Sequence, residues 1–291
     1  MELSSKWPIK ALCDVMDINR SGFYKWRSRL LNPCPRVKKR MDDIILFEKY
    51  HDKYPSHGYR WLNAKIRLDL GLIMSDQYAH RCCKFAGIKS QSKHYAYKKR
   101  DEKSKTYENM VLASLNIDGP LQVIVSDMTA FWAKKTYWEL TLYMDLWNNE
   151  IVGYGLSSRR GDRNTYYEGL TKVIEKIKGI EGLELILHTD QGSVYSSKSF
   201  NEILPTYHIT HSMSRAGTPT DNGAMEAING WAKTEMFIDF KINECDDVPT
   251  FIERYITFFN EERPACTLGY LTPYAYRQLH SSKKQQVSTK C

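Results

Sequence analysis

The spacing of apolar residues predicts two short helices at the start of the chain. In the stretch WPIKALCDVMDINRSGFYKWRSR (residues 7–29), apolar positions recur at helical intervals and are interrupted by Asn-Arg-Ser-Gly. Ser21 is the expected N-cap of the second helix, which carries Lys25 and Arg27. This outline fits a helix-turn-helix that contacts DNA, and it fits a plain helical hairpin equally well. We predict a helix-turn-helix-like segment over residues 1–40.

A second helical block, followed by a basic linker, is predicted over residues 41–105. The prolines and basic residues of PCPRVKKR (33–40) indicate a linker before the block. Within it, HGYRWLNAKIRLDLGL has apolar residues on one helical face, and SDQYAHRCCKFAGI starts from an expected cap at Ser75. The segment KKRDEKSK (98–105) is highly charged and poor in apolar residues, which predicts a tether between two domains.

Beyond Gly119-Pro120 the period of the pattern changes, and strands alternate with helices. The segments predicted to be strands are Leu121–Ser126, Tyr137–Asp145, Glu150–Leu156, Leu183–His188 and Ile209–Met213. The segments predicted to be helices are Asp162–Lys178, the stretch that follows the turn signal Asp221-Asn222-Gly223 and ends at Phe237, and Val248–Glu262. This order predicts an α/β domain over residues 110–280, with a mixed sheet flanked by helices on both faces, and a tail over 281–291.

Composition indicates a globular protein without membrane spans. The 291-residue chain is 42% apolar, and no stretch reaches about 18 uninterrupted apolar residues. The N-terminus lacks the pattern of a signal peptide, so the expected location is the cytoplasm. Seven cysteines at irregular spacing do not suggest a disulfide framework. Adjacent Cys82 and Cys83, without any Cys-x-x-Cys pair, also make a zinc site an unfavourable interpretation.

Charge is distributed unevenly along the chain. Residues 1–110 contain 24 Lys and Arg against 12 Asp and Glu, a net charge of +12, whereas the other 181 residues contain 18 against 22, a net charge of −4. A basic first part suits a polyanion such as DNA, and an acidic second part suits chemistry that needs carboxylates. The alternative, that Lys and Arg only solvate the surface, explains this contrast less well.

Three acids stand where an α/β fold places its ligands. Asp127 follows the first predicted strand, Asp190 follows the fourth, and Glu226 lies in the first turns of the helix that ends at Phe237. Each alone has an ordinary interpretation, as a strand end, a loop residue or a helix-start carboxylate. Crowded together, three carboxylates would repel one another unless a divalent cation such as Mg²⁺ compensated their charge. A pair of such ions would serve phosphodiester displacement without a protein nucleophile.

The segments around these acids resemble those of a known family. They are SDMT, HTDQGSVYSS, SMSRAGTPTDNGAMEAINGWAKTE and RYITFFNEERPACTLGYLTPYAYR. They are similar to bacterial insertion-sequence transposases of the OrfB type, which belong with retroviral integrases in the DDE superfamily, and the resemblance extends from about Cys13 to Arg277. It implies a ribonuclease-H-like core in which Asp127, Asp190 and Glu226 bind two Mg²⁺ or Mn²⁺ ions. It also implies cleavage of DNA at transposon ends and transfer of the freed 3′-hydroxyl to another phosphodiester.

The resemblance gives expected roles to several further residues. Lys233, on the same helix face as the family's glutamate, would contact DNA near the scissile phosphate, and Arg215 would meet a phosphate. His188, Gln191 and Asn222 would hold the acids or the start of their helix in place. Each of these residues also has a purely structural interpretation of similar weight.

Further partners follow from the same resemblance. HGYRWL, which includes Arg60, resembles the helical DNA-binding region that precedes the core in this family, so Arg60 joins Lys25 and Arg27 as an expected DNA contact. Two transposon ends need two active sites, which predicts a dimer or higher oligomer on DNA. The family also tends to produce this protein fused behind a separate DNA-binding subunit encoded upstream. No membrane partner is expected, and the expected location is the bacterial cytoplasm, in association with the nucleoid.

Two alternatives remain open at this point. One is a metal-dependent nuclease of the same fold that lacks strand transfer, and the other is a DNA-binding regulator built on an inactive core. Joining of labelled 3′ ends to a target separates the transposase from the nuclease, and metal-dependent cleavage excludes the regulator. Asp145 also ends a predicted strand, but the resemblance does not place it in the triad.

Overall fold

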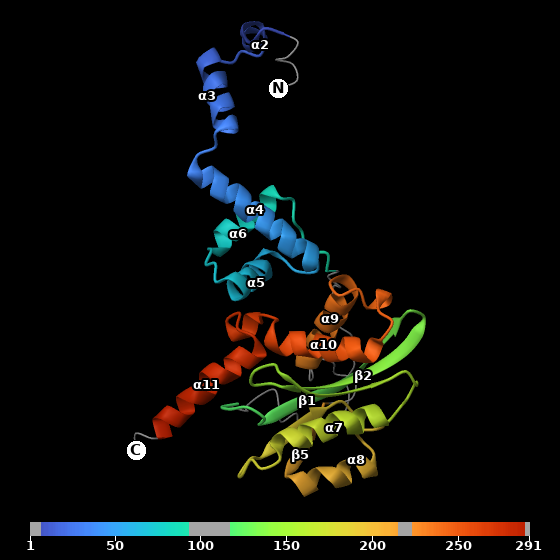
Figure 1. Ribbon diagram of the computed structural model, residues 1–291. Coiled ribbons are helices and arrows are strands. Elements are labelled where there is room, and N and C mark those ends of the chain that lie inside the picture. The colour runs from blue at the N-terminus through green and yellow to red at the C-terminus, as the bar shows by residue number, and fades with distance from the viewer. Residues whose placement is uncertain (1–6, 93–116, 215–222, 289–291) are drawn as a thin grey trace, which may run out of the picture.

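The structure is a computed structural model that describes residues 7–92, 117–214 and 223–288 (Figure 1). The helices of its first part are α2 (Ile9–Val15), α3 (Arg20–Leu31), α4 (Pro35–Lys53), α5 (Tyr59–Leu70) and α6 (Asp76–Phe85). The strands are β1 (Val123–Ala133), β2 (Thr136–Asp145), β3 (Ile151–Ser157), β4 (Leu185–Thr189) and β5 (Ile209–Met213). The other helices are α7 (Asn164–Ile177), α8 (Lys198–Ile203), α9 (Gly223–Ile238), α10 (Val248–Glu261) and α11 (Pro273–Ser288). Among the described residues, no helix has both the length and the apolar character needed to cross a bilayer.

Strand β1 is the centre of a mixed sheet. The five strands lie in the order β3-β2-β1-β4-β5. β1 pairs antiparallel with β2 and parallel with β4, and β4 pairs parallel with β5. With helices on both faces of this sheet, the predicted ribonuclease-H-like α/β fold is confirmed (Figure 1).

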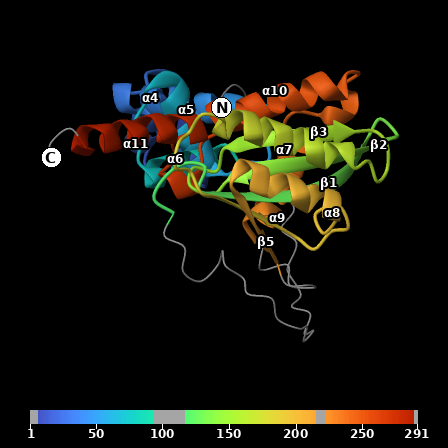
Figure 2. The same ribbon diagram turned by 90° about the horizontal axis from the view of Figure 1, so that it is seen from below.

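Side chains alternate across the sheet and form two apolar clusters, one on each face. Val125 and Phe131 of β1 belong to the cluster beneath α9 and α10, whereas Ile124 belongs to the cluster beneath α7 and α8. Figure 2 shows α7 and α8 lying across the strands on their side. Helix α7 packs very closely on β3. A Cβ atom added at Gly155 would lie only 2.0 Å from the backbone oxygen of Thr165. These two clusters hold the elements that position the acids.

Helices α4–α6 pack against the core and share its apolar cluster (Figure 1). Tyr54, at the end of α4, is buried and stacks on Phe258 of α10 with ring centroids 6.0 Å apart. Ser56 donates hydrogen bonds to Asp239 from its backbone nitrogen at 2.8 Å and from its Oγ at 2.6 Å. In Figure 1, α2 and α3 lie at the opposite end of α4 from these contacts.

A buried ionic cluster, which we call the Glu235 cluster, strengthens this contact; its members are His57, Glu235, Asp239, Tyr255 and Arg263. Glu235 is fully buried and accepts hydrogen bonds from Arg263 Nε at 2.7 Å and from Tyr255 Oη at 2.8 Å. His57 Nε2 lies 3.3 Å from Glu235 Oε1 and 3.4 Å from Asp239 Oδ2, an ion-pair geometry shared between two carboxylates. Burial alone would raise the pKa of Glu235, but Arg263 and His57 outweigh it and the pKa is lowered.

Asp145, which ends β2, has a structural role. It is fully buried and accepts hydrogen bonds from the backbone nitrogens of Leu121 at 2.8 Å and Trp147 at 3.0 Å. Arg277 of α11 lies 3.3 Å from the same carboxylate and 3.0 Å from that of Glu150. Asp145 therefore anchors α11 to the sheet, which agrees with its exclusion from the predicted triad.

The first strand differs from its prediction. The apolar run Leu121–Ser126 placed Asp127 after the strand, whereas β1 begins at Val123 and continues to Ala133, so Asp127 lies inside it. The apolar run ends early because the first four residues of β1 are all buried, whereas from Met128 onward buried and partly exposed positions alternate. A strand segment buried on one face only needs apolar residues on that face alone, so a search for continuous apolar runs misses it.

Several helix boundaries also differ from their predictions. Asn19, not Ser21, caps α3, because Asn19 Oδ1 accepts a hydrogen bond from the Ser21 nitrogen at 2.9 Å. The run predicted as a linker is the beginning of α4, since Pro35 occupies the first helical position, where no backbone N–H is needed. The boundaries predicted at 40/41 and 280/281 therefore fall inside α4 and α11. The predicted tether, 98–105, lies outside the described residues.

Candidate active site

The sheet brings Asp127 and Asp190 to neighbouring positions. In the parallel register between β1 and β4, the last pair is Ser126 opposite Thr189. Asp127 and Asp190 are the residues that come directly after this last pair, so the two acids occupy neighbouring positions just beyond it. Parallel strands end at the same edge, which is where folds of this type place their ligands. The predicted pairing of these two acids is therefore supported by backbone register.

Asp127 is held toward α9. Asp127 is an even number of residues from Val125 and Phe131 in β1, so its side chain points to the same face of the sheet, the one covered by α9. Its Oδ2 accepts a hydrogen bond from Asn229 Nδ2 at 2.9 Å, and its Oδ1 accepts one from the backbone nitrogen of Met128 at 2.9 Å. Asn229 is buried, which makes this contact a fixed link between helix and strand.

One face of α9 points at Asp127. Lys233 lies one turn after Asn229 and is half-buried; burial lowers the pKa of its ammonium group, and the charge of Asp127 opposes that shift. Position 226 lies three residues before Asn229 and shares its helical face. We call positions 226, 229 and 233 the acid-side face of α9. Glu226 is described by its backbone only, so its side chain lies outside the described structure.

Asp190 is exposed and begins the loop after β4. Its Oδ1 accepts a hydrogen bond from the Gly192 backbone nitrogen at 2.9 Å, and a Cβ at Gly192 would lie 2.9 Å from that same oxygen. Tyr166 of α7 interacts electrostatically with both acids. Burial raises the pKa of Tyr166 to about 12, and the charges of Asp190, Glu139 and Asp127 add to that shift. Tyr166 thus lies within the electrostatic reach of both Asp127 and Asp190.

Sequence reasoning missed Asn229 and Tyr166. Asn229 was accessible to it, since it lies one helical turn after Glu226 and one turn before Lys233. Tyr166 was not, because its electrostatic interaction with Asp190 and Asp127 depends on how α7 packs on the sheet. The helical spacing of Asn229 can be found in the local sequence, whereas the position of Tyr166 cannot.

The residues expected to support the acids have different positions. His188 is fully buried in β4, and its two ring nitrogens contact Ser212 Oγ at 3.0 Å and Ser214 Oγ at 2.9 Å. These bonds link β4 to β5 and the residue that follows β5. Gln191 is half-buried, and its backbone oxygen accepts a hydrogen bond from Ser196 Oγ at 3.2 Å, within the loop after Asp190. Asn222 lies outside the described residues.

The expected DNA contacts are spread over the molecule. Lys25 is exposed and Arg27 half-buried on α3, far from the sheet in Figure 1. Arg60 lines a cavity between α5 and the core, with its guanidinium 5.5 Å from the Tyr59 ring centre. Lys233 is the expected contact that lies beside Asp127. Arg215 lies outside the described residues.

The donor set around Asp127 and Asp190 suits a hard cation. Both residues offer carboxylate oxygens, the ligands that Mg²⁺ and Mn²⁺ prefer. Asn229 Oδ1, beside Asp127, is a buried oxygen without a hydrogen-bond partner. Among the described side chains, no group of three His, Cys, Asp or Glu is arranged to hold a metal, and Glu226 is not among those side chains.

The comparisons with known proteins agree with this geometry. The integrase core domain family matches residues 118–219, and a second integrase core domain family matches residues 207–273. The chain is 29% identical over 279 residues to the putative transposase InsK for insertion sequence element IS150 of Escherichia coli, covering 95% of each chain. It is 30% identical over 199 residues to a transposase-like protein of Haemophilus influenzae, covering 68% of this chain and 90% of that one.

The fold and these matches define the class. The chain belongs to the family of bacterial insertion-sequence transposases with an integrase core domain. It is therefore an enzyme of the DDE transposase and integrase type that acts in DNA transposition. Among solved structures it is similar to a simian T-cell lymphotropic virus intasome, at 19% identity and a TM-score of 0.49 over 75% of this chain and 74% of that chain.

Proposed function

We propose that Asp127, Asp190 and Glu226 form one metal-binding centre, and that this centre cuts DNA at transposon ends and transfers the freed 3′-hydroxyl to a target. The observation that carries the proposal is the meeting of three elements. β1 and β4 present Asp127 and Asp190 side by side, and Asn229 fastens the acid-side face of α9 to Asp127. Glu226 stands one turn before that contact.

The residues divide the work as follows. Asp127 and Asp190 supply oxygens from adjacent strands, and Glu226 supplies the third carboxylate from α9. Two Mg²⁺ or Mn²⁺ ions, when bound there, polarise the phosphodiester and assist the attacking and leaving oxygens. Asn229 fixes the orientation of Asp127 through its 2.9 Å hydrogen bond. Lys233 places a positive charge beside Asp127, where it binds a DNA phosphate.

The test is the Asp190→Asn protein on DNA that carries the element's own ends. Mg²⁺-dependent nicking should fall by more than about a hundredfold, because a metal ligand contributes more than the residues that merely orient it. DNA affinity in the absence of metal should stay within about twofold of the parent, since the phosphate contacts persist. Glu202→Gln is the matched control, because Glu202 is an exposed carboxylate on α8, and it should nick normally. Normal nicking by Asp190→Asn would refute the assignment.

The same assay distinguishes strand transfer from hydrolysis. A labelled 3′ end joined to a target DNA is the product expected of a transposase, whereas a nuclease releases fragments only. The insertion-sequence relatives favour the transposase. We also propose that a dimer or larger assembly acts on the two ends, and that a separately encoded DNA-binding subunit assists it. Gel filtration with and without DNA tests the first of these points.

A further inference from the structure

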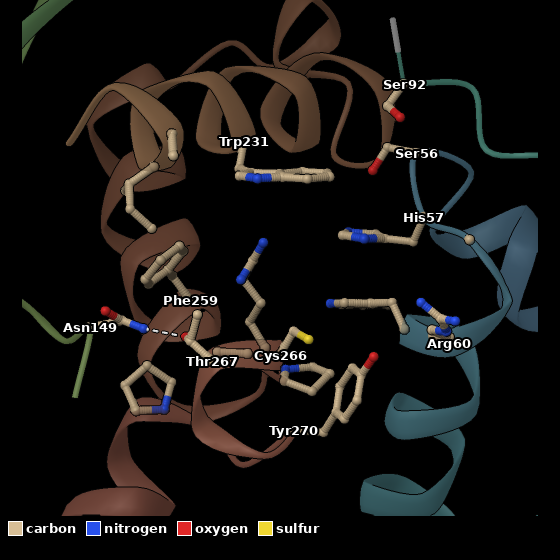
Figure 3. Close-up of a pocket in the computed structure, with 18 of the residues that line it drawn as sticks. Ser56, His57, Arg60, Ser92, Asn149, Trp231, Phe259, Cys266, Thr267 and Tyr270 are labelled. Carbon is tan, nitrogen blue, oxygen red and sulfur yellow. Dashed lines mark hydrogen bonds between the residues drawn. The ribbon is translucent and has the colours of Figure 1, made fainter. Parts of the chain in front are cut away.

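A large cavity lies between α5 and the core (Figure 3). Its volume is about 650 Å³, within the range of sites that hold small molecules. Ala227 and Trp231 of α9 line it, and these positions are turned by roughly half a circle from the acid-side face. His57 and Arg60 line it from the helical block, and Arg263 lines it from the core.

The cavity wall contains three parallel aromatic rings. Trp61 and His57 stack with centroids 3.6 Å apart and an interplanar angle of 11°, and Trp231 is parallel to His57 within 5°, with centroids 6.3 Å apart. Figure 3 shows Trp231 and His57 at the boundary where the two parts of the chain meet. His57 is fixed by two carboxylates of the Glu235 cluster, so this wall is held rigidly in place. Trp231 is 41% exposed, which leaves part of its surface open to a ligand.

The remaining groups define what kind of ligand would fit. Phe259 and Tyr270 add further ring surface. Ser56 and Ser92 lie at one side of the cavity in Figure 3, where the Ser56 hydroxyl donates to Asp239 and the Ser92 hydroxyl is hydrogen-bonded to Ser90, so each keeps only acceptor or shared capacity for a ligand. The Arg60 side chain is 65% exposed, and its guanidinium lies 4.0 Å from the exposed carboxylate of Asp76, so it supplies a solvent-exposed cation with one weak ion-pair partner. A ligand that fits these groups has flat apolar faces, polar edges and an attached anion. A nucleobase on its phosphate backbone has all three properties.

We propose that this cavity, across α9 from the acids, binds a nucleobase that has left its stack in single-stranded or opened DNA. Trp231 is the stacking platform, and Arg60 pairs with the adjoining phosphate. The inference rests on the proposed function, because that function supplies the DNA. It adds a site that positions the strand relative to α9, separate from the acids that do the chemistry.

The test compares two short single-stranded oligodeoxynucleotides that carry the same fluorescent label. One has all its bases, and the other has tetrahydrofuran abasic residues throughout. Binding of the full chain is followed by anisotropy in EDTA, so that no cleavage occurs. The parent should bind the base-bearing strand at least about fivefold more tightly, the lower end of what a stacked base contributes. Trp231→Ala should bring this ratio close to one, and Trp231→Phe should keep part of it.

Trp132→Ala is the matched control, because Trp132 is a 57% exposed tryptophan at the end of β1, away from the cavity. It should keep the parent's ratio. An unchanged ratio in Trp231→Ala overturns the proposal, as does an equal loss in Trp132→Ala. A Trp231→Ala protein whose oligomeric state changes while its ratio is unchanged would show that a second copy occupies the cavity instead.

The outcomes also separate this inference from the proposed function. A parent that binds both strands equally overturns the cavity proposal and leaves metal-dependent nicking untouched. A parent that binds neither strand overturns the cavity proposal, and it contradicts the transposase assignment only if nicking of the element's ends is also absent.

Discussion

Carboxylates lie on two sides of helix α9, and the two groups have different hydrogen-bond and ion-pair partners. On the acid-side face, Asp127 accepts a hydrogen bond from the neutral amide of Asn229, and Asp190 accepts one from a backbone nitrogen. On the other side, Glu235 contacts the guanidinium of Arg263 and the imidazole of His57 directly. The Glu235 cluster is compensated by protein cations in direct contact with its carboxylates, which makes it part of the architecture. On the acid-side face, Lys233 is a neighbouring cation whose charge interacts with Asp127. Asp190 is exposed, so this side still suits a cation from solution.

Helix α9 contacts both sides. Asn229 connects α9 to β1 at one side, and Asp239, just beyond the helix end, connects it to Ser56 at the other. Variants that break one side at a time test how independent the two sides are.

The largest effect is expected from Arg263→Ala. It leaves Glu235 buried with a charge that His57 compensates only in part, and breaking such a pair costs about 3–5 kcal/mol of unfolding free energy. Chemical denaturation followed by circular dichroism measures this loss. Lys198→Ala is the control, since its pair with Glu202 on α8 is exposed and should contribute less than about 1 kcal/mol. Equal losses in the two variants would show that the Glu235 cluster does not stabilise the fold.

A smaller and different effect is expected from Asn229→Ala. Removing the amide frees one oxygen of Asp127 from its orienting contact, which should lower Mg²⁺-dependent nicking by about 10–100-fold. The free energy of unfolding should change by only about 1 kcal/mol, the contribution of a single hydrogen bond. Nicking rates at saturating DNA, set beside denaturation curves, separate the two quantities. A variant that loses stability and keeps its nicking rate would place Asn229 with the structural side instead.

Local pattern was sufficient for much of the fold. The strand Ile209–Met213 was predicted with its observed limits, and α10 was placed within one residue of its end. Both segments have clear periodicity and ordinary boundaries, a turn or a cap. The positions of Asp127 and Asp190 relative to apolar runs were also visible, and the parallel register of β1 and β4 supports bringing them together.

What the sequence could not show depends on contacts between distant segments. HGYRWL was interpreted as part of a DNA-binding region, yet His57 is buried against Glu235, which lies far along the chain. Nothing around His57 indicates a partner, because the pairing is created by the docking of α5 on α9 and α10. The start of α4 was missed for a local reason, since a proline before basic residues is common to both linkers and helix starts.

The smallest effect is a dependence of stability on pH. Burial lowers the pKa of His57, but its interactions with Asp239 and Glu235 outweigh that shift, and the pKa lies above the ordinary 6.5. The stabilisation is therefore complete below pH 6.5 and is lost as the pH rises through the folded-state pKa. The pKa of Tyr255 is raised well above 10.0, so Tyr255 does not titrate in this window. The difference in unfolding free energy between the parent and His57→Gln should be largest in mildly acidic buffer and should shrink toward alkaline pH. A difference that grows with pH would mean that His57 is buried as a neutral ring, and that Arg263 alone compensates Glu235.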